Sequence, residues 1–224
     1  MYMLPKAATA AYTYLITNPD NKVMWKNYHY YIEQPEVDQK EVIDLESLEF
    51  IVSYKLGKDS YQQKNWGETI AAMEEALNKY IHFENDCRFE CEEHTHVDGS
   101  QHFINAVASN TEYILNCKQK CQDEVKQLSY SSGSEFIADV LNYLQISYYH
   151  LNKIEDGAKA VASYLLIYPN DEDMIENKKI YSSLINEDAF IVRNDIVNYV
   201  ERDNSEKKLL EFIQSNNESY EVHS

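Results

Sequence analysis

Four cysteines are the residues of this sequence whose type and spacing most clearly indicate chemistry. They form two motifs with the same spacing, Cys87-x3-Cys91 and Cys117-x3-Cys121. Positions i and i+4 of a helix share a face, so each motif presents two sulfurs to one neighbouring element. We therefore expect two disulfides between the motifs, which are common in the secretory pathway and rare in the cytosol. Four cysteines allow three pairings.

Helix geometry limits how the two motifs can pair. In a simple helical hairpin the first motif lies about six residues from the turn and the second about twenty, a mismatch near 20 Å at about 1.5 Å per residue. No disulfide spans such a distance. The mismatch disappears if one helix ends near Tyr80 and the first motif lies on a separate short helix, docked against a long helix over about residues 103–128. The favoured pairs are Cys87 with Cys121 and Cys91 with Cys117.

A zinc site is an alternative for the first motif, because thiolates and imidazoles are zinc ligands. Five such residues lie close together in the sequence: Cys87, Cys91, His94, His96 and His102. Zinc binding would leave the second motif without a role, and the spacing fits no well-known zinc finger. We expect the histidines to be polar residues of an exposed loop over residues 92–99, and we predict no metal site.

An iron site is a second alternative. The tripeptide His96-Val97-Asp98 has the form that begins the two-histidine, one-carboxylate iron site of 2-oxoglutarate dioxygenases. Those sites lie inside a β jelly roll, and nothing in this sequence predicts strands. A tripeptide this short also arises often by chance. We therefore predict no catalytic residue and no cofactor.

The elements that carry the cysteines are predicted to be helices. The chain has 224 residues with only 5 Gly and 4 Pro, fewer turn residues than a strand-rich protein needs. Its net charge of −18 disfavours binding to nucleic acid and to anionic membranes. An apolar share of 44% argues against disorder, and no apolar run is long enough to span a bilayer.

The sequence contains an internal repeat. A shift of 150 positions aligns residues 7–31 with residues 157–181, and each copy reads as an apolar helix, a turn with proline, and a second helix capped by Asn or Asp. Eight aligned positions are identical: Ala8/Ala158, Ala10/Ala160, Tyr14/Tyr164, Leu15/Leu165, Pro19/Pro169, Met24/Met174, Asn27/Asn177 and Tyr31/Tyr181.

The residues before Pro169 follow the pattern of a tetratricopeptide (TPR) repeat, in which small residues mark the crossing of two helices. A second match pairs a helix of about residues 45–62 with one of about residues 67–80; here Gly57 is the residue of close approach and Trp66 fills the wedge between the helices. The closing proline of that repeat is missing. These patterns predict an all-α fold, a tetratricopeptide-like α-solenoid of antiparallel helix pairs with disulfide-linked Cys-x3-Cys helices.

The first copy of the repeat is incomplete. Residues 7–14 read as the second helix of a repeat whose first helix needs about 15 residues upstream, yet only six precede it. Residues 1–20 also lack the basic end, apolar centre and cleavage site of a signal peptide. We expect the chain to be part of a longer protein, with its first repeat truncated at the N-terminus.

Taken together, these residues resemble the helical region of the leprecan and cartilage-associated protein family, whose hallmark is paired Cys-x3-Cys motifs among tetratricopeptide-like helices. The likeness extends from about Ala7 to Asp188. The matching segments are residues 72–80, 87–91, 116–121, 142–149, 164–166 and 169–172. The resemblance is specific, because the repeat, both cysteine motifs and the tyrosine-rich run occur in the same order.

The resemblance implies a function in the endoplasmic reticulum. Members of this family belong to a collagen-modifying assembly of a prolyl 3-hydroxylase, a non-catalytic cartilage-associated protein and a cyclophilin-type prolyl isomerase. The hydroxylases carry a dioxygenase domain after the helical region, and this sequence ends before such a domain. The implied role is a non-catalytic scaffold that binds procollagen chains or partner subunits, in the lumen of the endoplasmic reticulum.

The extent of the resemblance predicts two parts of the chain: a leprecan-like helical repeat region over residues 1–188, and amphipathic helices with a polar tail over residues 189–224. In a secretory protein, Asn217-Glu218-Ser219 is an acceptor for N-glycosylation.

Tyrosine offers flat apolar area with a polar tip, which suits proline-rich chains. The candidate partner-binding residues are Tyr113, Tyr143, Tyr148, Tyr149 and Tyr164.

A cytosolic tetratricopeptide adaptor that binds peptide tails is the alternative function. It predicts reduced cysteines and, usually, a cluster of basic residues that binds a carboxylate. The repeat helices carry no such cluster.

Overall fold

The structure is a computed structural model and describes residues 3–93 and 103–221. Within these residues it contains α-helices and short 3-10 helices but no strand, so the predicted all-α class is confirmed. The α-helices are α1 (Met3–Thr17), α2 (Lys22–Ile32), α3 (Glu49–Gln62), α4 (Trp66–Glu93), α5 (Phe103–Lys120), α6 (Gly133–His150), α7 (Ile154–Ile167), α8 (Glu172–Ser182) and α9 (Asn194–Glu221). None of the described helices is both long and apolar enough to cross a bilayer.

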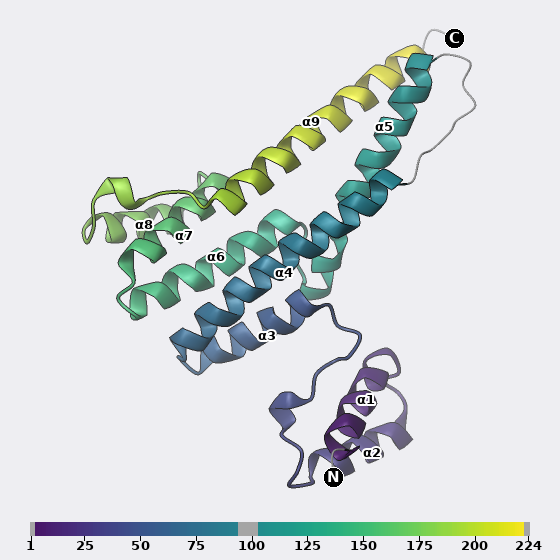
Figure 1. The fold of residues 1–224 in the computed structure, drawn as a ribbon, viewed down its shortest axis with the longest axis vertical. Coiled ribbons are helices and arrows are strands. Elements are labelled where there is room, and N and C mark those ends of the chain that lie inside the picture. Colours follow the sequence, from purple (N-terminus) through teal and green to yellow (C-terminus); the bar gives the residue numbers. More distant parts are fainter. Residues whose placement is uncertain (1–2, 94–102, 222–224) are drawn as a thin grey trace.

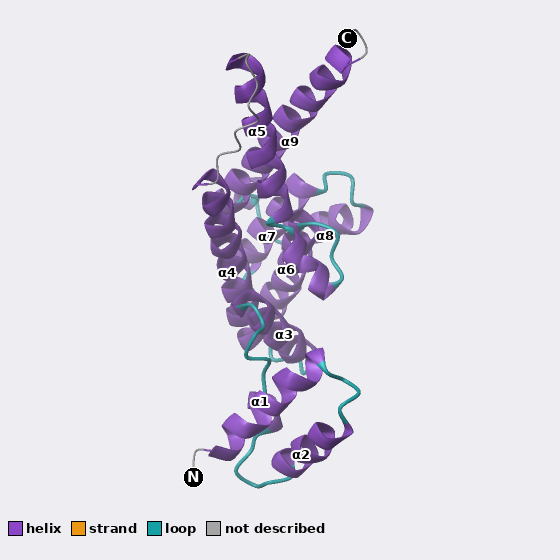
Figure 2. Cartoon of the chain, turned by 90° about the vertical axis from the view of Figure 1, so that its right-hand side faces the viewer, coloured by secondary structure: helices purple, strands orange, loops and turns teal. Residues whose placement is uncertain are grey.

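The helices pack as successive antiparallel pairs, as expected for a tetratricopeptide-like solenoid. Helix α3 packs on α4, α6 packs on α7, and α4 packs on α6 to join the two pairs (Figure 1). The α1–α2 pair lies at one end of the molecule, and α5 and α9 lie side by side at the other end (Figures 1 and 2).

Aromatic side chains fill the core where α3, α4 and α6 meet. Phe136 contacts four aromatic rings edge-on, at centroid distances of 5.5 Å to Phe50, 5.3 Å to Tyr54, 4.9 Å to Tyr80 and 5.7 Å to Tyr130. Edge-to-face pairs of this kind contribute beyond the area that they bury. Helix α9 supplies Tyr199 to the same core.

Small residues mark the helix crossings, as the repeat pattern predicts. A Cβ atom at Gly57 on α3 would lie 2.8 Å from the side chain of Met73 on α4. A Cβ atom at Gly157 on α7 would lie 2.3 Å from the hydroxyl of Tyr181 on α8. The rigid ring of Tyr181 leaves no room for a side chain at position 157, whereas the flexible end of Met73 makes a close but adjustable contact at Gly57.

The duplicated segments fold alike. Asn21 caps α2 by accepting a hydrogen bond from the backbone N–H of Met24 at 3.0 Å, and Asp171 caps α8 by accepting one from Met174 at 2.8 Å. These caps lie 150 positions apart, as the sequence repeat requires. The shared hydrogen bond shows that the two copies keep the same local geometry.

Three expected helix boundaries were wrong. The helix predicted over residues 67–80 continues to Glu93, so Cys87 and Cys91 lie on α4 and not on a separate short helix. Residues 81–93 contain no glycine or proline, so nothing in the local sequence ends the helix. The helix expected from residue 45 begins at Glu49, and the helix expected over residues 103–128 ends at Lys120, followed by a 3-10 helix at Asp123–Leu128.

The C-terminal segment is one helix, α9, whose first turns are part of the main core through Ile196 and Tyr199. The division of the chain at Asp188 stays a prediction.

Candidate functional site

The two cysteine motifs face each other on α4 and α5. Cys87 is joined to Cys121 and Cys91 to Cys117, and both pairs have a Cα–Cα distance of 5.8 Å. These are the pairs that the sequence favoured. The sulfurs of Cys91 and Cys121, which belong to different disulfides, lie 4.0 Å apart, so the four sulfurs form one compact cluster.

The expected length mismatch is real, but it does not require a broken helix. Cys91 lies two residues from the end of α4, whereas Cys117 lies fourteen residues from the start of α5. Helix α5 therefore extends about 18 Å beyond α4 at about 1.5 Å per residue. Nine residues separate the two helices, and a chain of that length can reach about 30 Å. The connection is long enough to accommodate the offset.

Disulfide bonding conflicts with a zinc site at the first motif. Among the described residues, the sulfurs of Cys87, Cys91 and Cys121 lie within 4.8 Å of one another. All three are in disulfides, and a disulfide sulfur is not the thiolate that zinc requires. The other candidate ligands, His94, His96 and His102, and the His96-Val97-Asp98 tripeptide lie outside the described residues.

A buried ionic network lies beside the disulfides and attaches α9 to them. Arg88 donates to Glu84 at 2.9 Å, and Arg202 donates to the same carboxylate oxygen at 3.0 Å. Glu206 on α9 pairs with Arg88 and lies 3.6 Å from the ammonium of Lys118. The Glu84 side chain is 0% exposed. A carboxylate this deeply buried is stable only because two guanidinium groups neutralise it.

Burial, followed by the nearby charge of Arg202, lowers the pKa of Arg88. This network was not predicted from the sequence. Its signal is an acid and a base four positions apart on one helix face, which occurs as Glu84-x3-Arg88 on α4 and as Arg202-x3-Glu206 on α9.

Three of the five candidate tyrosines lie between helices. Tyr143 packs edge-on against Tyr61 with ring centroids 4.9 Å apart. Tyr148 donates to Glu74 on α4 at 3.0 Å, and Tyr164 donates to Asp171 at 3.0 Å. Burial and the hydrogen bond to Asp171 raise the pKa of Tyr164 to about 12. These side chains have structural contacts that account for their positions.

Tyr149 and Tyr113 are the more exposed candidates, and they lie on different helices, α6 and α5. The Tyr149 side chain is 45% exposed and packs edge-on against Tyr181, with ring centroids 5.9 Å apart. It lines a shallow pocket of about 250 Å³ between α6 and α8. The pocket is lined by Gln145, Ile146, Tyr149, Asn177, Ile180 and Tyr181. The five tyrosines therefore do not form one surface.

A hydrogen-bonded triad that was not predicted from the sequence connects α3 to α6. Tyr54 and Tyr130 both donate to the same carboxylate oxygen of Asp139, at 2.7 Å and 2.5 Å, and their hydroxyls contact each other. Burial is the main cause that raises the pKa of both tyrosines. No sequence spacing links these residues, because two of the contacts join positions more than 70 residues apart.

The glycosylation acceptor Asn217 lies within the bounds of α9, but its side chain is not among those that the structure describes. Its use stays a prediction.

Comparison with known proteins finds a family whose sequence model matches most of this chain. The sequence model of the Leprecan family TPR-like repeat region matches residues 1–185. Prolyl 3-hydroxylase 1 of Mus musculus is 30% identical over 222 residues, which cover 93% of this chain and 30% of the relative. Cartilage-associated protein of Mus musculus is 29% identical, over 94% of this chain and 54% of the relative. Prolyl 3-hydroxylase 2 of Homo sapiens is 27% identical, over 92% of this chain and 31% of the relative.

The chain thus spans about a third of the length of the hydroxylases and about half of cartilage-associated protein. Its repeats, its cysteine pairs and the extent of these matches lead to one conclusion: the chain belongs to the leprecan family.

Proposed function

We propose that this chain is a non-catalytic helical scaffold of the collagen prolyl 3-hydroxylation machinery. The observation that carries the proposal is the family match over residues 1–185, which covers the helical repeats and both cysteine motifs. The relatives include proteins named prolyl 3-hydroxylase as well as cartilage-associated protein. Helical repeats typically function by binding partners on an extended surface.

The side chains of the junction between α4, α5 and α9 support a structural role for that region. Glu84, Arg88, Arg202 and Glu206 are engaged with one another, and the four cysteines are engaged in disulfides. A general acid or a nucleophile needs a free functional group that reaches substrate. These groups instead hold three helices together.

The lumen of the endoplasmic reticulum is the compartment that suits the scaffold, because two adjacent disulfides need an oxidising environment to form. The alternative, a cytosolic tetratricopeptide adaptor, requires reduced cysteines. Intact mass after alkylation without reductant separates the two functions. Protein from a secretory expression route is expected to add no alkyl group, whereas four alkylated thiols would contradict the scaffold function and favour the adaptor.

The same sample tests glycosylation. Use of Asn217 adds glycan mass that an endoglycosidase removes and that the Asn217→Gln variant lacks. An unchanged mass in the wild-type chain would contradict it.

The pocket beside Tyr149 is the surface where we propose that procollagen chains bind. A proline-rich chain offers carbonyl acceptors and flat rings, but no N–H donor at proline. Tyr149 and Ile180 supply exposed apolar area, and Asn177 supplies an amide in the same pocket. Aromatic surfaces with nearby donors are the usual receptor for such chains.

Binding of a short, single-stranded peptide of repeated Pro-Pro-Gly tests this surface. Tyr149→Ser and Ile180→Ser are each expected to weaken binding about fivefold to tenfold. Tyr30→Ser is the matched control, because Tyr30 is an exposed tyrosine on α2, a different helix pair. Equal losses in all three variants, or no binding by the wild-type chain, would contradict the proposed surface.

Family membership also supports two partner proteins, a prolyl 3-hydroxylase and a cyclophilin-type prolyl isomerase. Size-exclusion chromatography of the purified chain with each partner is expected to show a shared peak. Separate peaks with both partners would contradict the assembly.

A further inference from the structure

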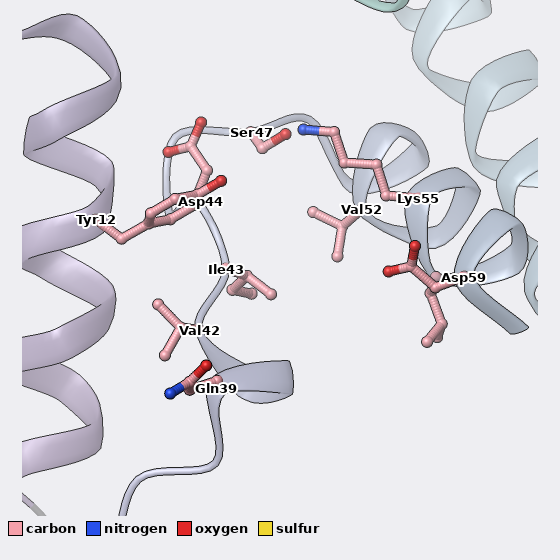
Figure 3. Close-up of a pocket in the computed structure, with 10 residues that line it drawn as sticks. Tyr12, Gln39, Val42, Ile43, Asp44, Ser47, Val52, Lys55 and Asp59 are labelled. Atoms are coloured by element: carbon pink, nitrogen blue, oxygen red, sulfur yellow. The ribbon is translucent and has the colours of Figure 1, made fainter. Parts of the chain in front are cut away.

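A second pocket lies where the connection between α2 and α3 runs between α1 and α3. It has a volume of about 330 Å³ and receives Tyr12 from α1, Ile43 and Asp44 from the connection, and Leu56 and Asp59 from α3 (Figure 3). The connection is tied to α1 by a hydrogen bond of 2.8 Å from the backbone N–H of Leu45 to the hydroxyl of Thr13. Three segments therefore line the pocket, and the connection among them is hydrogen-bonded to α1.

The apolar side chains of this pocket are uncovered. On α3, the face with Ile51, Tyr54 and Gly57 is buried in the core, and the opposite face carries Val52 and Leu56 into the pocket. The Leu56 side chain is 47% exposed and Ile43 is 41% exposed. Exposed apolar side chains from two segments that meet in one pocket are typical of a binding site.

The rim of the pocket is acidic. The charged residues that line it are two carboxylates, Asp44 and Asp59, and one cation, Lys55. No described cation forms an ion pair with either carboxylate. The whole connection is acidic, because residues 33–48 contain six acidic residues, Asp44 among them, and one lysine. This local excess, on a chain of net charge −18, attracts cations.

We propose that this pocket binds a basic segment of a partner protein, in which a leucine-sized side chain is flanked by lysine or arginine residues. The apolar side chain fills the space between Ile43 and Leu56, and the flanking cations pair with Asp44 and Asp59. Charge complementarity selects a basic partner over an acidic or neutral one. The site is separate from the pocket between α6 and α8 that is proposed to bind proline-rich chains, and it does not depend on that proposed function.

A labelled helical peptide of lysine and leucine is a suitable probe, with binding measured by fluorescence anisotropy on the full chain. Leu56→Ser is expected to weaken binding about tenfold, because a buried leucine contact is lost. Ile43→Ser, on the connection, is expected to weaken it similarly and serves as the second variant if Leu56→Ser alters the helix content. Leu209→Ser is the matched control, because Leu209 on α9 is 45% exposed and lies outside the pocket.

The charges are tested separately. The double variant Asp44→Asn/Asp59→Asn is expected to weaken binding about fivefold at low ionic strength and less at high salt. Its control is Glu187→Gln/Asp188→Asn, which changes the net charge equally at a distant 3-10 helix. An equal loss of peptide binding in Asp44→Asn/Asp59→Asn and in its control would overturn the site, because the peptide would then be attracted to the whole acidic surface. An equal loss in Leu56→Ser and Leu209→Ser would overturn it as well. Failure of the wild-type chain to bind the peptide would also overturn it.

Discussion

Tyr181 donates its hydroxyl hydrogen to the backbone carbonyl of Gln145 at a distance of 2.6 Å. Both residues are buried, and the bond joins α8 to α6. Gly157 on α7 faces the same hydroxyl, so three helices meet at one polar atom. Tyr31 is the counterpart of Tyr181 in the duplicated α1–α2 unit and is more exposed. The burial of Tyr181 and its hydrogen bond therefore depend on the neighbouring helix α6, and not on the repeated α7–α8 unit alone.

Tyr181→Phe is expected to lower the free energy of unfolding by about 1 kcal/mol, because it removes one buried hydrogen bond between α8 and α6. Urea unfolding followed by circular dichroism measures the change. Tyr31→Phe is the control and should alter stability by less than about 0.5 kcal/mol. Equal stability of Tyr181→Phe and the wild-type chain would show that the hydrogen bond does not contribute.

Gly157→Ala is expected to destabilise the chain by about 1–3 kcal/mol, since the new methyl group collides with Tyr181. Gly67→Ala is the matched control on α4, where a Cβ atom meets nothing within 4 Å. Alanine has the higher helix propensity, so this control should be neutral or slightly stabilising. Similar melting temperatures for the two variants would contradict the close approach of α7 and α8.

Removal of either disulfide is expected to lower the free energy of unfolding by about 2–3 kcal/mol, because each one restricts the unfolded chain. Cys91–Cys117 lies inside Cys87–Cys121, so each bond closes the same short extra loop, residues 87–91 and 117–121, while the other bond remains, and the two losses should be similar. Paired serine substitutions avoid a free thiol, and denaturant unfolding under non-reducing conditions gives the values. Peptide mapping of the wild-type chain that finds other pairs would contradict the arrangement.

Arg88→Met is expected to cost about 3–5 kcal/mol, because Glu84 would lose one of its two cations while remaining buried. The double variant Glu84→Gln/Arg88→Met should lose less than the sum of the single changes, as a coupled pair does. Lys126→Met serves as a control, since Lys126 pairs with Asp123 on an exposed surface and should contribute less than about 0.5 kcal/mol. Additive losses would show that Glu84 and Arg88 are not coupled.

The chain is expected to lose stability in alkali as the pH rises from 10 towards 12. The pKa of Tyr164 is raised to about 12 from its ordinary value of 10.0, and burial raises those of Tyr54, Tyr80 and Tyr199 as well. A raised folded-state pKa means that the unfolded chain releases its proton first, so the stabilisation is complete below pH 10 and lost above it.

Tyrosinate absorbance and circular dichroism, measured together against pH, check this expectation. The buried tyrosines should ionise only together with the loss of helix. Their ionisation near pH 10, with the helices intact, would contradict this expectation.

Several features could be predicted from residue order because they depend on local patterns. The duplicated α1–α2 and α7–α8 units follow from eight identities at one shift, and their caps follow from Asn21 and Asp171. The two cysteine motifs share one spacing, which predicts that they face each other on neighbouring helices, as they do on α4 and α5. The end of α4 does not follow the repeat pattern, because no glycine or proline lies between Tyr80 and Glu93 to end the helix.

Other features were decided only when distant segments came together. Glu84 meets Arg202 across 118 positions, Tyr54 meets Asp139 across 85, and Tyr181 meets Gln145 across 36. Helical periodicity shows which face of a helix is apolar, but not which helix covers that face or how far the two are offset along their axes. Those choices depend on the packing of whole helices, which also determines which tyrosines are buried and which acidic and apolar side chains line the pocket between α1 and α3.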